Sequence, residues 1–407
     1  MKALVLAGGF PQIALIKELK SRGITTVLAD YYENPVAKPY ADIFYRASTL
    51  DIDAITEIAS KEKVDFLITA CTDQALLTVA KVSETLGLPC YIDYQTGLNV
   101  TNKSYMKKVF SEYNIPTAKH VVMAELDMEK IKGMEFPLIV KPVDCNSSKG
   151  VKKVTNEAEL TKAFNDAVRF SRTDTAIVEE FIEGEELSAD VYVENGVAHL
   201  LSVSSLDKIA NNDKFVIYRG FYSYERTESV RGVITEIAQQ IADAFGLKNS
   251  PMLIQTIYDG KRAFVLEFSA RTGGGVKYLL IKKVSGFDVI SAVVDLTLGN
   301  KPSVGKLEPE NKLIMNEFIY CYPGTFKRLD GFEEMKSEGI LSDYYLFKWE
   351  GAVFDTIENS GDRIAGFTIQ ADTMEELREK HHAVLDRARV LDINGKDIMR
   401  RDLFCEF

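Results

Sequence analysis

Short apolar runs alternate with amphipathic stretches along the first hundred or so residues of the chain. The runs are typical of strands, whereas the longer stretches have the apolar spacing of helices. Strands separated by helices of about ten residues indicate βαβ units and a parallel sheet. The predicted strands are residues 2–6, 25–30, 42–45 and 66–70, and the predicted helices are residues 12–21, 52–61 and 76–86.

Beyond about residue 100 the strand-like runs occur in neighbouring pairs. Two pairs flank turns typical of hairpins, Glu194-Asn195-Gly196 and Asp259-Gly260. This pattern indicates an α+β arrangement with antiparallel strands, which differs from the first segment. Pro89 and the turn-forming residues 93–102 mark the boundary between the two. The predicted strands are residues 138–141, 176–181, 187–193, 199–206, 253–258 and 263–268, and the predicted helices are residues 103–113, 157–169, 230–245 and 374–385.

The turn after the first strand has part of a dinucleotide-binding pattern. Gly8 and Gly9 stand where the strand meets the helix, and Asp30 ends the second strand. A Rossmann site for NAD needs the fingerprint G-x-G-x-x-G, which is absent here. The sequence therefore favours a tight βα turn, and a substrate contact or NAD binding at this turn remains an alternative.

Composition narrows the classes of partner. The chain has 407 residues, 46% of them hydrophobic, and a formal net charge of −11. Such an acidic balance argues against broad binding to nucleic acid or to an anionic membrane surface. Its apolar runs are shorter than the ~20 residues that a membrane-spanning helix needs. The five cysteines are scattered without a C-x-x-C pair, so we expect neither a disulfide framework nor a zinc site, and a soluble protein of the reducing cytoplasm.

Two neighbouring features suit phosphate groups. Lys141 ends an apolar strand and is followed by Pro142, which holds the lysine backbone extended. A small polar loop, residues 144–151, comes next and offers backbone N–H groups and hydroxyls to an anion. Taken alone, Lys141 would be explained by a solvated lysine at a strand end, and the loop by an ordinary hairpin loop.

Acidic residues form two further features. The run Glu179-Glu180-Phe181-Ile182 leads to a bend at Gly184, and a solvated acidic edge would explain it as well. Farther on, Glu267 interrupts an apolar strand that pairs with the strand carrying Gln255, and Arg271 follows four residues later. A buried carboxylate needs a partner or a cation, so Glu267 with Gln255 suits magnesium, although a simple ion pair with Arg271 is the alternative.

Taken in order along the chain, these features resemble the ATP-grasp superfamily over roughly residues 1–300, with the carbamoyl-phosphate-synthetase-like and amino-acid-ligase-like branches nearest. The family signature Glu-x-Asn-x-Arg is matched by Glu267-Phe268-Ser269-Ala270-Arg271, with Ser269 in place of asparagine. The resemblance implies an N-terminal Rossmann-like sheet followed by an ATP-grasp fold. The implied divisions are residues 1–98 for the N-terminal domain, 99–185 for a lid, 186–305 for a catalytic subdomain and 306–407 for a mixed α/β segment.

The resemblance also assigns roles to individual residues. It implies that Arg271 and Lys141 are catalytic and that magnesium, or manganese in its place, is bound by Gln255, Glu267 and Ser269. The serine at position 269 weakens the expected metal ligation. The residues that it implies for ATP are Lys103, Lys141, Ser147, Ser148, Gly150, Glu179, Glu180, Phe181, Ile182 and Glu186. For the substrate, the sequence offers Arg271, Gly273, Gly274 and Arg219, although Arg219 in a surface loop would be merely solvated.

The resemblance predicts an ATP-dependent ligase that joins a carboxylate, an amino acid among the candidates, to an amine through an acyl phosphate, with release of ADP and phosphate. An enzyme that activates bicarbonate or a nucleotide precursor is one alternative. A regulatory protein that binds ATP without turnover, motivated by Ser269, is another. The expected partners are small molecules and not nucleic acid or membrane, and homodimerisation, common in the superfamily, is left open.

Overall fold

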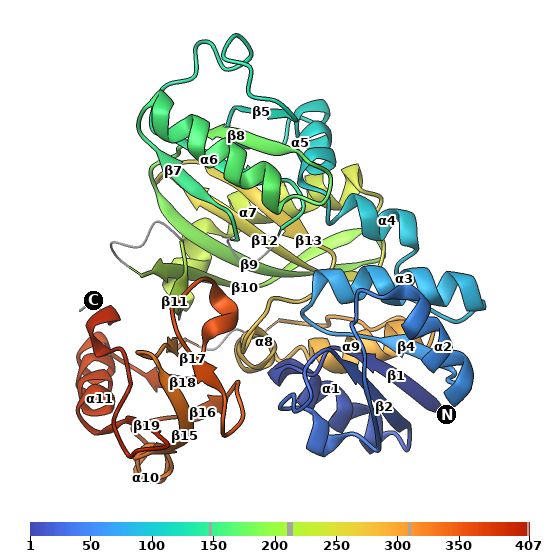
Figure 1. The fold of residues 1–407 in the computed structure, drawn as a ribbon, viewed down its shortest axis with the longest axis vertical. Helices are drawn as coiled ribbons and strands as arrows, with labels where there is room; N and C mark the ends of the chain where they lie inside the picture. The colour runs from blue at the N-terminus through green and yellow to red at the C-terminus, as the bar shows by residue number, and fades with distance from the viewer. Residues whose placement is uncertain (146–148, 210–214, 308–310, 405–406) are drawn as a thin grey trace.

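The computed structural model describes residues 1–145, 149–209, 215–307, 311–404 and 407. Figure 1 shows a central sheet with a small lobe above it and the N-terminal layer below it on one side, and on the other side the sheet continues down into the C-terminal part of the chain. None of the helices in the described residues is long and apolar enough to cross a membrane. The compartment in which the protein works stays a prediction.

The N-terminal layer is the predicted parallel sheet. Its four strands lie in the order β3-β2-β1-β4 and pair in parallel, because each is followed by a helix that returns the chain to the same edge. The strands are β1 (Lys2–Leu6), β2 (Thr25–Asp30), β3 (Ile43–Arg46) and β4 (Phe66–Ile68). The helices are α1 (Phe10–Ser21), η1 (Lys38–Tyr40), α2 (Ile52–Glu62), α3 (Asp73–Leu86) and α4 (Tyr94–Asn99).

The glycine turn after β1 has a structural explanation. A Cβ on Gly8 would lie 2.6 Å from the Cβ of Pro35, so only glycine fits there. The Gly8 N–H donates a hydrogen bond to the Asp30 carboxylate at 2.6 Å. Asp30 therefore closes the turn itself, which favours the tight βα turn over the NAD alternative.

The small lobe is an antiparallel sheet in the order β5-β8-β6-β7. Its strands are β5 (His120–Met123), β6 (Leu138–Pro142), β7 (Lys152–Val154) and β8 (Ala176–Glu180). Helix α5 (Lys103–Glu112) leads into the lobe, and α6 (Glu157–Phe170) covers the sheet with Leu160, Phe164 and Ala167. Figure 1 shows this lobe above the central sheet.

The central sheet has eight strands in the order β13-β12-β9-β10-β11-β14-β18-β16, all neighbours pairing antiparallel. Both predicted hairpins are present. The sheet continues across the predicted division at residues 305 and 306, because β14 pairs with β11; the division itself stays a prediction. The strands are β9 (Glu185–Glu194), β10 (Val197–Lys208), β11 (Ile217–Ser223), β12 (Ser250–Tyr258), β13 (Ala263–Ser269), β14 (Leu313–Ile319), β16 (Asp343–Leu346) and β18 (Ala365–Ala371).

Helices join these layers. Helix α7 (Tyr224–Ala244) packs its apolar face on the central sheet. Helices α8 (Lys277–Ser285) and α9 (Val289–Thr297) follow β13 but share a core with the N-terminal layer, where Ile281 and Val293 pack with Val5 and Leu28. The remaining elements are β15 (Gly324–Asp330), α10 (Phe332–Ser337), β17 (Val353–Phe354), η2 (Ser360–Asp362), α11 (Met374–Arg387), β19 (Arg389–Asp392) and η3 (Arg401–Leu403).

The bend between β8 and β9 requires glycine at position 184. A Cβ there would lie 2.5 Å from the carbonyl oxygen of Tyr258 and 2.7 Å from Ile257, on the neighbouring strand β12. Gly184→Ala is therefore expected to lower the free energy of unfolding by about 1–3 kcal/mol, because the backbone must shift. Urea unfolding followed by circular dichroism measures this.

Gly232 is the matched control, because a Cβ on this α7 residue would meet nothing within 4 Å. Gly232→Ala is expected to raise stability by about 0.5–1 kcal/mol, as alanine favours helix. Equal effects of the two substitutions would contradict the close approach at Gly184.

Candidate active site

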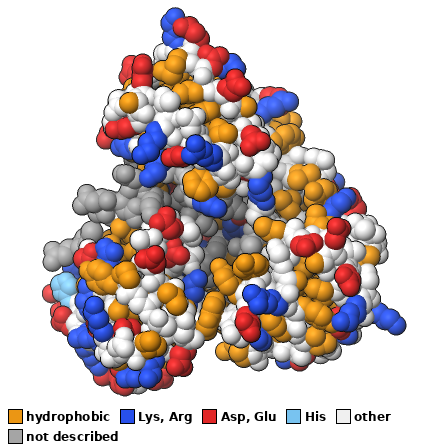
Figure 2. All heavy atoms as spheres, in the orientation of Figure 1, with side chains coloured by type: hydrophobic (Ala, Val, Ile, Leu, Met, Phe, Trp, Pro, Cys, Tyr) orange, Lys and Arg blue, Asp and Glu red, His pale blue; other side chains and the backbone are white. Residues whose placement is uncertain are grey.

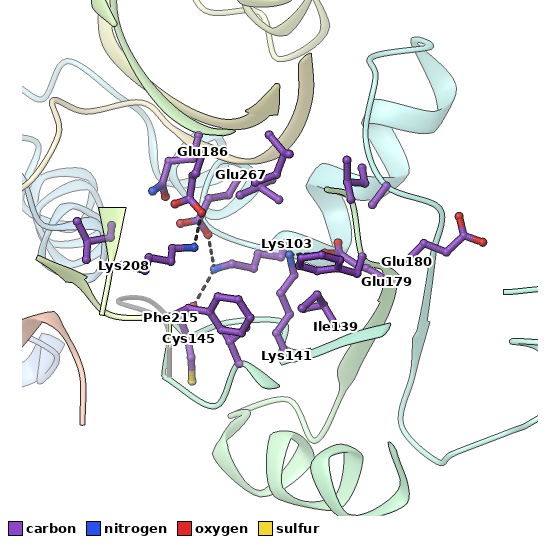
Figure 3. Close-up of a pocket in the computed structure, with 18 residues that line it drawn as sticks. Lys103, Ile139, Lys141, Cys145, Glu179, Glu180, Glu186, Lys208, Phe215 and Glu267 are labelled. Atoms are coloured by element: carbon purple, nitrogen blue, oxygen red, sulfur yellow. Dashed lines mark hydrogen bonds and ion pairs between the residues drawn. The ribbon is translucent and has the colours of Figure 1, made fainter. Parts of the chain in front are cut away.

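A cavity of about 140 Å³, called here the first cavity, lies between the small lobe and the central sheet. It contains most of the residues that the sequence assigned to ATP. Figure 2 shows the hollow between the lobes, and Figure 3 shows the side chains that point into it. Its lining includes Lys103, Lys141, Glu179, Glu180, Phe181, Ile182, Glu186, Lys208, Phe215, Gln255 and Glu267.

Lys103 is fixed at the start of α5. The Asn102 side chain accepts a hydrogen bond from the Tyr105 N–H and so caps the helix immediately before Lys103. The Lys103 Nζ lies 2.9 Å from a Glu267 carboxylate oxygen and donates to the carbonyl oxygen of Cys145 at 2.7 Å (Figure 3). Burial alone would raise the pKa of Glu267, but the Lys103 charge outweighs burial and lowers it.

Lys141 and Glu179 form a buried cluster with Lys107, which the sequence analysis did not single out. One Glu179 oxygen lies 2.7 Å from the Lys141 Nζ and the other 2.7 Å from the Lys107 Nζ. Burial favours the neutral carboxyl, but the two ammonium groups outweigh it and hold the pKa of Glu179 at about 2. Burial, with Lys141 adding to it, lowers the pKa of Lys107 to about 8. In the structure Glu179 is therefore the counter-ion of two lysines.

The remaining predicted ATP residues lie around this cluster. The Glu186 carboxylate pairs with Lys208, and the Lys153 Nζ lies 3.6 Å from the centre of the Phe181 ring. Gly150 is a turn residue with a φ of +75°, and it is the next residue, Val151, that lines the cavity. Ser147 and Ser148 lie outside the described residues. Their roles, and those of the residues above, stay predictions.

The three predicted metal ligands lie together. Gln255 and Glu267 are directly opposite one another on β12 and β13. With Ser269 and Asp73 they line a small third cavity of about 20 Å³, which is room for one small ion or water. Carboxylate, amide and hydroxyl oxygens are a donor set that fits magnesium. The described residues contain no group of three or more His, Cys, Asp or Glu side chains placed for a metal, so such an ion also needs ligands from elsewhere.

Asp73, the first residue of α3 in the N-terminal layer, contacts two residues of the Glu267–Arg271 motif. Its carboxylate accepts hydrogen bonds from Arg271 at 2.6 and 2.5 Å and contacts the hydroxyl of Ser269. Burial alone would raise the pKa of Asp73, but Arg271 outweighs burial and lowers it. The alternative of a simple Glu267–Arg271 ion pair is therefore wrong, because Arg271 pairs with Asp73 and Glu267 pairs with Lys103. No local pattern in the sequence marks Asp73, which lies 198 positions before Arg271.

A second cavity of about 420 Å³ adjoins the first and shares Gln255, Glu267 and Ile217 with it. The predicted substrate residues Arg271, Gly273 and Gly274 line it. The N-terminal layer, the central sheet and the C-terminal segment all contribute residues to its wall. Further lining residues are Cys71, Thr72, Asp73, Gln74, Ser188, Ser204, Leu206, Gly220, Leu253, Val276, Lys277, Asn316, Phe318, Ser360 and Arg363.

Arg219, the fourth predicted substrate residue, does not line either of these cavities. It is only 2% exposed, so the solvated surface loop is wrong as well. Its Nε donates to Glu317 at 2.5 Å, its Nη1 lies 3.3 Å from Asp207, and His381 contacts the other Glu317 oxygen at 2.9 Å. Residues alternate between the two faces of a strand, and Arg219 faces away from the cavities while its neighbour Gly220 faces the second one.

Comparisons with known proteins find similar sequences and folds among ATP-dependent enzymes. Residues 134–278 match the family model of the ATP-grasp domain. The chain is 22% identical over 407 aligned positions to the phosphoribosylamine–glycine ligase of Streptomyces coelicolor, covering 95% of each. It is also 22% identical over 317 positions to the carbamoyl phosphate synthase large chain of Clostridium acetobutylicum, where the match covers 72% of this chain and 28% of that one.

Solved structures share the fold over nearly the whole chain. The L-amino acid ligase of Bacillus licheniformis superposes with a TM-score of 0.80 at 19% identity, covering 96% of this chain and 99% of that one. The phosphoribosylglycinamide synthetase of Anaerococcus prevotii gives a TM-score of 0.74 at 20% identity, with the same coverage.

Residues 134–278 therefore form an ATP-grasp domain, and nearly the whole chain has the fold of solved ATP-grasp ligases. This confirms the resemblance and the fold predicted from the sequence.

Proposed function

We propose that this protein is a carboxylate–amine ligase that activates an organic carboxylate with ATP and releases ADP and phosphate. The observation that carries the proposal is the shared wall of the two cavities. Gln255 and Glu267 line both, so a group bound in the second cavity lies next to the phosphate end of a nucleotide in the first. The relatives named as amino acid and glycine ligases support the same chemistry.

In the proposed reaction a carboxylate oxygen attacks the γ-phosphorus of ATP, and the bond from this phosphorus to the ADP oxygen breaks. The amine nitrogen then attacks the acyl carbon, loses a proton, and displaces phosphate. Lys103 and Lys141 would bind the phosphates, and Arg271 would stabilise charge on the transferred group. Positioning and charge stabilisation suffice, so no covalent nucleophile is needed.

Magnesium fits the oxygens of Gln255, Glu267 and Ser269, and when bound it supplies charge neutralisation between the phosphates. In the structure the Lys103 ammonium pairs with Glu267. Adenine would lie near Glu180, Phe181 and Ile182, and ribose near Glu186.

Activation of bicarbonate or of a nucleotide precursor is the second candidate, as the carbamoyl phosphate synthase match indicates. The second cavity, at about 420 Å³, is within the usual range for organic ligands and far larger than bicarbonate alone requires. This size favours an organic carboxylate. We expect small molecules to be the partners, with a homodimer as the assembly that size-exclusion chromatography would test.

The test is to incubate the protein with magnesium and ATP together with pools of amino acids and other small carboxylates, and to follow ADP, phosphate and AMP separately. Glu267→Ala is the control. ADP and phosphate that appear only with a particular pool, and not with the variant, support the proposal. ATP binding without pool-dependent ADP would favour the regulatory alternative. AMP with pyrophosphate would overturn the acyl-phosphate mechanism.

A further inference from the structure

Three cationic side chains line the second cavity: Arg271, Lys277 and Arg363. Two of them have carboxylate partners. Arg271 pairs with Asp73 at 2.5 Å, and the Lys277 Nζ lies 3.3 Å from Asp190. Each of these two side chains is held in place by its carboxylate, and each pair carries no net charge.

Arg363 differs from the other two because its partners are neutral. Its Nε donates to the Tyr320 hydroxyl at 3.1 Å, its Nη2 donates to the Ile217 carbonyl at 3.1 Å, and its Cζ lies 3.7 Å from the centre of the Phe318 ring. Among the described residues it has no carboxylate within ion-pair distance. Its guanidinium is thus fixed in position, and no carboxylate in the described parts of the chain pairs with its charge.

Arg363 lies beside the glycine run that follows Arg271. A Cβ on Gly275 would lie 3.6 Å from the Arg363 Nη1 and 3.1 Å from Phe318, so a larger residue at 275 would crowd the guanidinium. Arg271 and Arg363 both line the second cavity, so a small molecule that fills this cavity can contact both arginines.

The total charge of the residues that line the second cavity also indicates that Arg363 binds an anion. Its two acidic residues, Asp73 and Glu267, are already paired with Arg271 and Lys103. The described lining residues therefore leave one net positive charge, located on Arg363. A planar guanidinium binds carboxylate or phosphate through two parallel hydrogen bonds, and Nη1 of Arg363 makes none within the described parts of the chain.

From these observations, and resting on the proposed function, we infer that the carboxylate substrate carries a second anionic group, which Arg363 binds. The substrate is then a dicarboxylate or a phosphorylated carboxylate, with one carboxylate activated beside Gln255 and Glu267. The positive charge at Arg363 selects against substrates with a single carboxylate. Arg363 is accordingly a residue that determines specificity.

Calorimetric titration tests this with the full chain, magnesium and a non-hydrolysable ATP analogue. The probes are glutarate and its one-carboxylate counterpart valerate, and 3-phosphonopropionate for the phosphate arm. We expect the better dianion to bind at least about tenfold more tightly than valerate, as charge-assisted hydrogen bonds to one group imply. Preference for glutarate or for the phosphonate then identifies the second anion.

Arg363→Met is expected to abolish this preference, and Arg363→Lys to retain part of it, because lysine keeps the charge but not the fork. Arg328→Met, at an exposed arginine paired with Asp330, is the matched control and should bind as the unmodified protein does. Binding of the ATP analogue should be unchanged in all three variants, which shows that they are folded.

Equal affinities for dianions and valerate, absence of binding of every probe, or a preference that survives Arg363→Met would each overturn the inference. These readouts need no turnover. Pool-dependent ADP release without a dianion preference would therefore refute the second anion and leave the ligase proposal standing. A dianion preference without ADP release would support the second anion and refute the ligase proposal.

Discussion

Replacing Glu267 with glutamine is expected to reduce ATP-dependent ligation by a factor of about a thousand or more. Glu267 is the one carboxylate among the three predicted metal ligands, and it lines all three cavities. Removing its charge weakens the hold on the metal, and several kcal/mol of transition-state stabilisation corresponds to a loss of this size. Initial rates of ADP release at increasing magnesium concentration measure it.

The substitution also leaves the buried Lys103 without its partner, so a loss of fold has to be separated from a loss of chemistry. Thermal unfolding and binding of an ATP analogue without metal serve for this. Glu129→Gln, at a side chain that is 82% exposed, is the matched control. A Glu267→Gln variant with unchanged turnover and an unchanged magnesium requirement would refute the assigned metal site.

Glu179→Gln is expected to lower the free energy of unfolding by about 3–5 kcal/mol, the usual cost of removing one partner from a buried ion pair. Glu179 is 2% exposed and is the acid that lies between Lys107 and Lys141. Its loss leaves two ammonium groups buried side by side. Urea unfolding at pH 7 measures the change.

The same cluster predicts how stability depends on pH. The pKa of Glu179 is about 2 in the folded protein and has an ordinary value of 4.5. The unfolded chain therefore takes up the proton first, so the stabilisation is complete above pH 4.5 and is lost as the pH falls toward 2. Unfolding free energies measured between pH 5 and pH 2 should fall less steeply in Glu179→Gln than in the unmodified protein.

The double variant Lys107→Met/Glu179→Gln is the control for this cluster. It removes one charge of each sign and leaves Lys141 alone, so it should be more stable than Glu179→Gln by itself. Additive effects of the two single substitutions would mean that Lys107 and Glu179 do not interact. That result would contradict the cluster.

Ser269 illustrates how a departure from the family pattern is accommodated. Its hydroxyl contacts Asp73, which in turn receives both hydrogen bonds from Arg271. Asp73 thus brings a second carboxylate to the third cavity, beside the place where the family has asparagine. The structure therefore weakens the reason for regarding Ser269 as a mark of lost turnover.

The sequence by itself determined the elements and the motif that they carry. Short apolar runs located β1 to β4, because the strands of a covered parallel sheet are buried on both faces. Paired strand-like runs around a turn located the β12–β13 hairpin. The hairpin also placed Gln255 and Glu267 on paired strands. A register shift between Gln255 and Thr256, which the turn does not predict, is what sets Gln255 directly opposite Glu267. Local signals of this kind identify residues that are close together along the chain.

Only the tertiary structure decided which distant charges are partners. Asp73 lies 198 positions before Arg271, and Arg363 enters the second cavity from the segment before β18. Arg219 looked suited to a substrate, but the pairing of β11 with β14 directs it to Glu317. A buried charge must find a counter-charge, and many acids along the chain are equally eligible. Packing of the layers selects among them, and no local pattern records that choice.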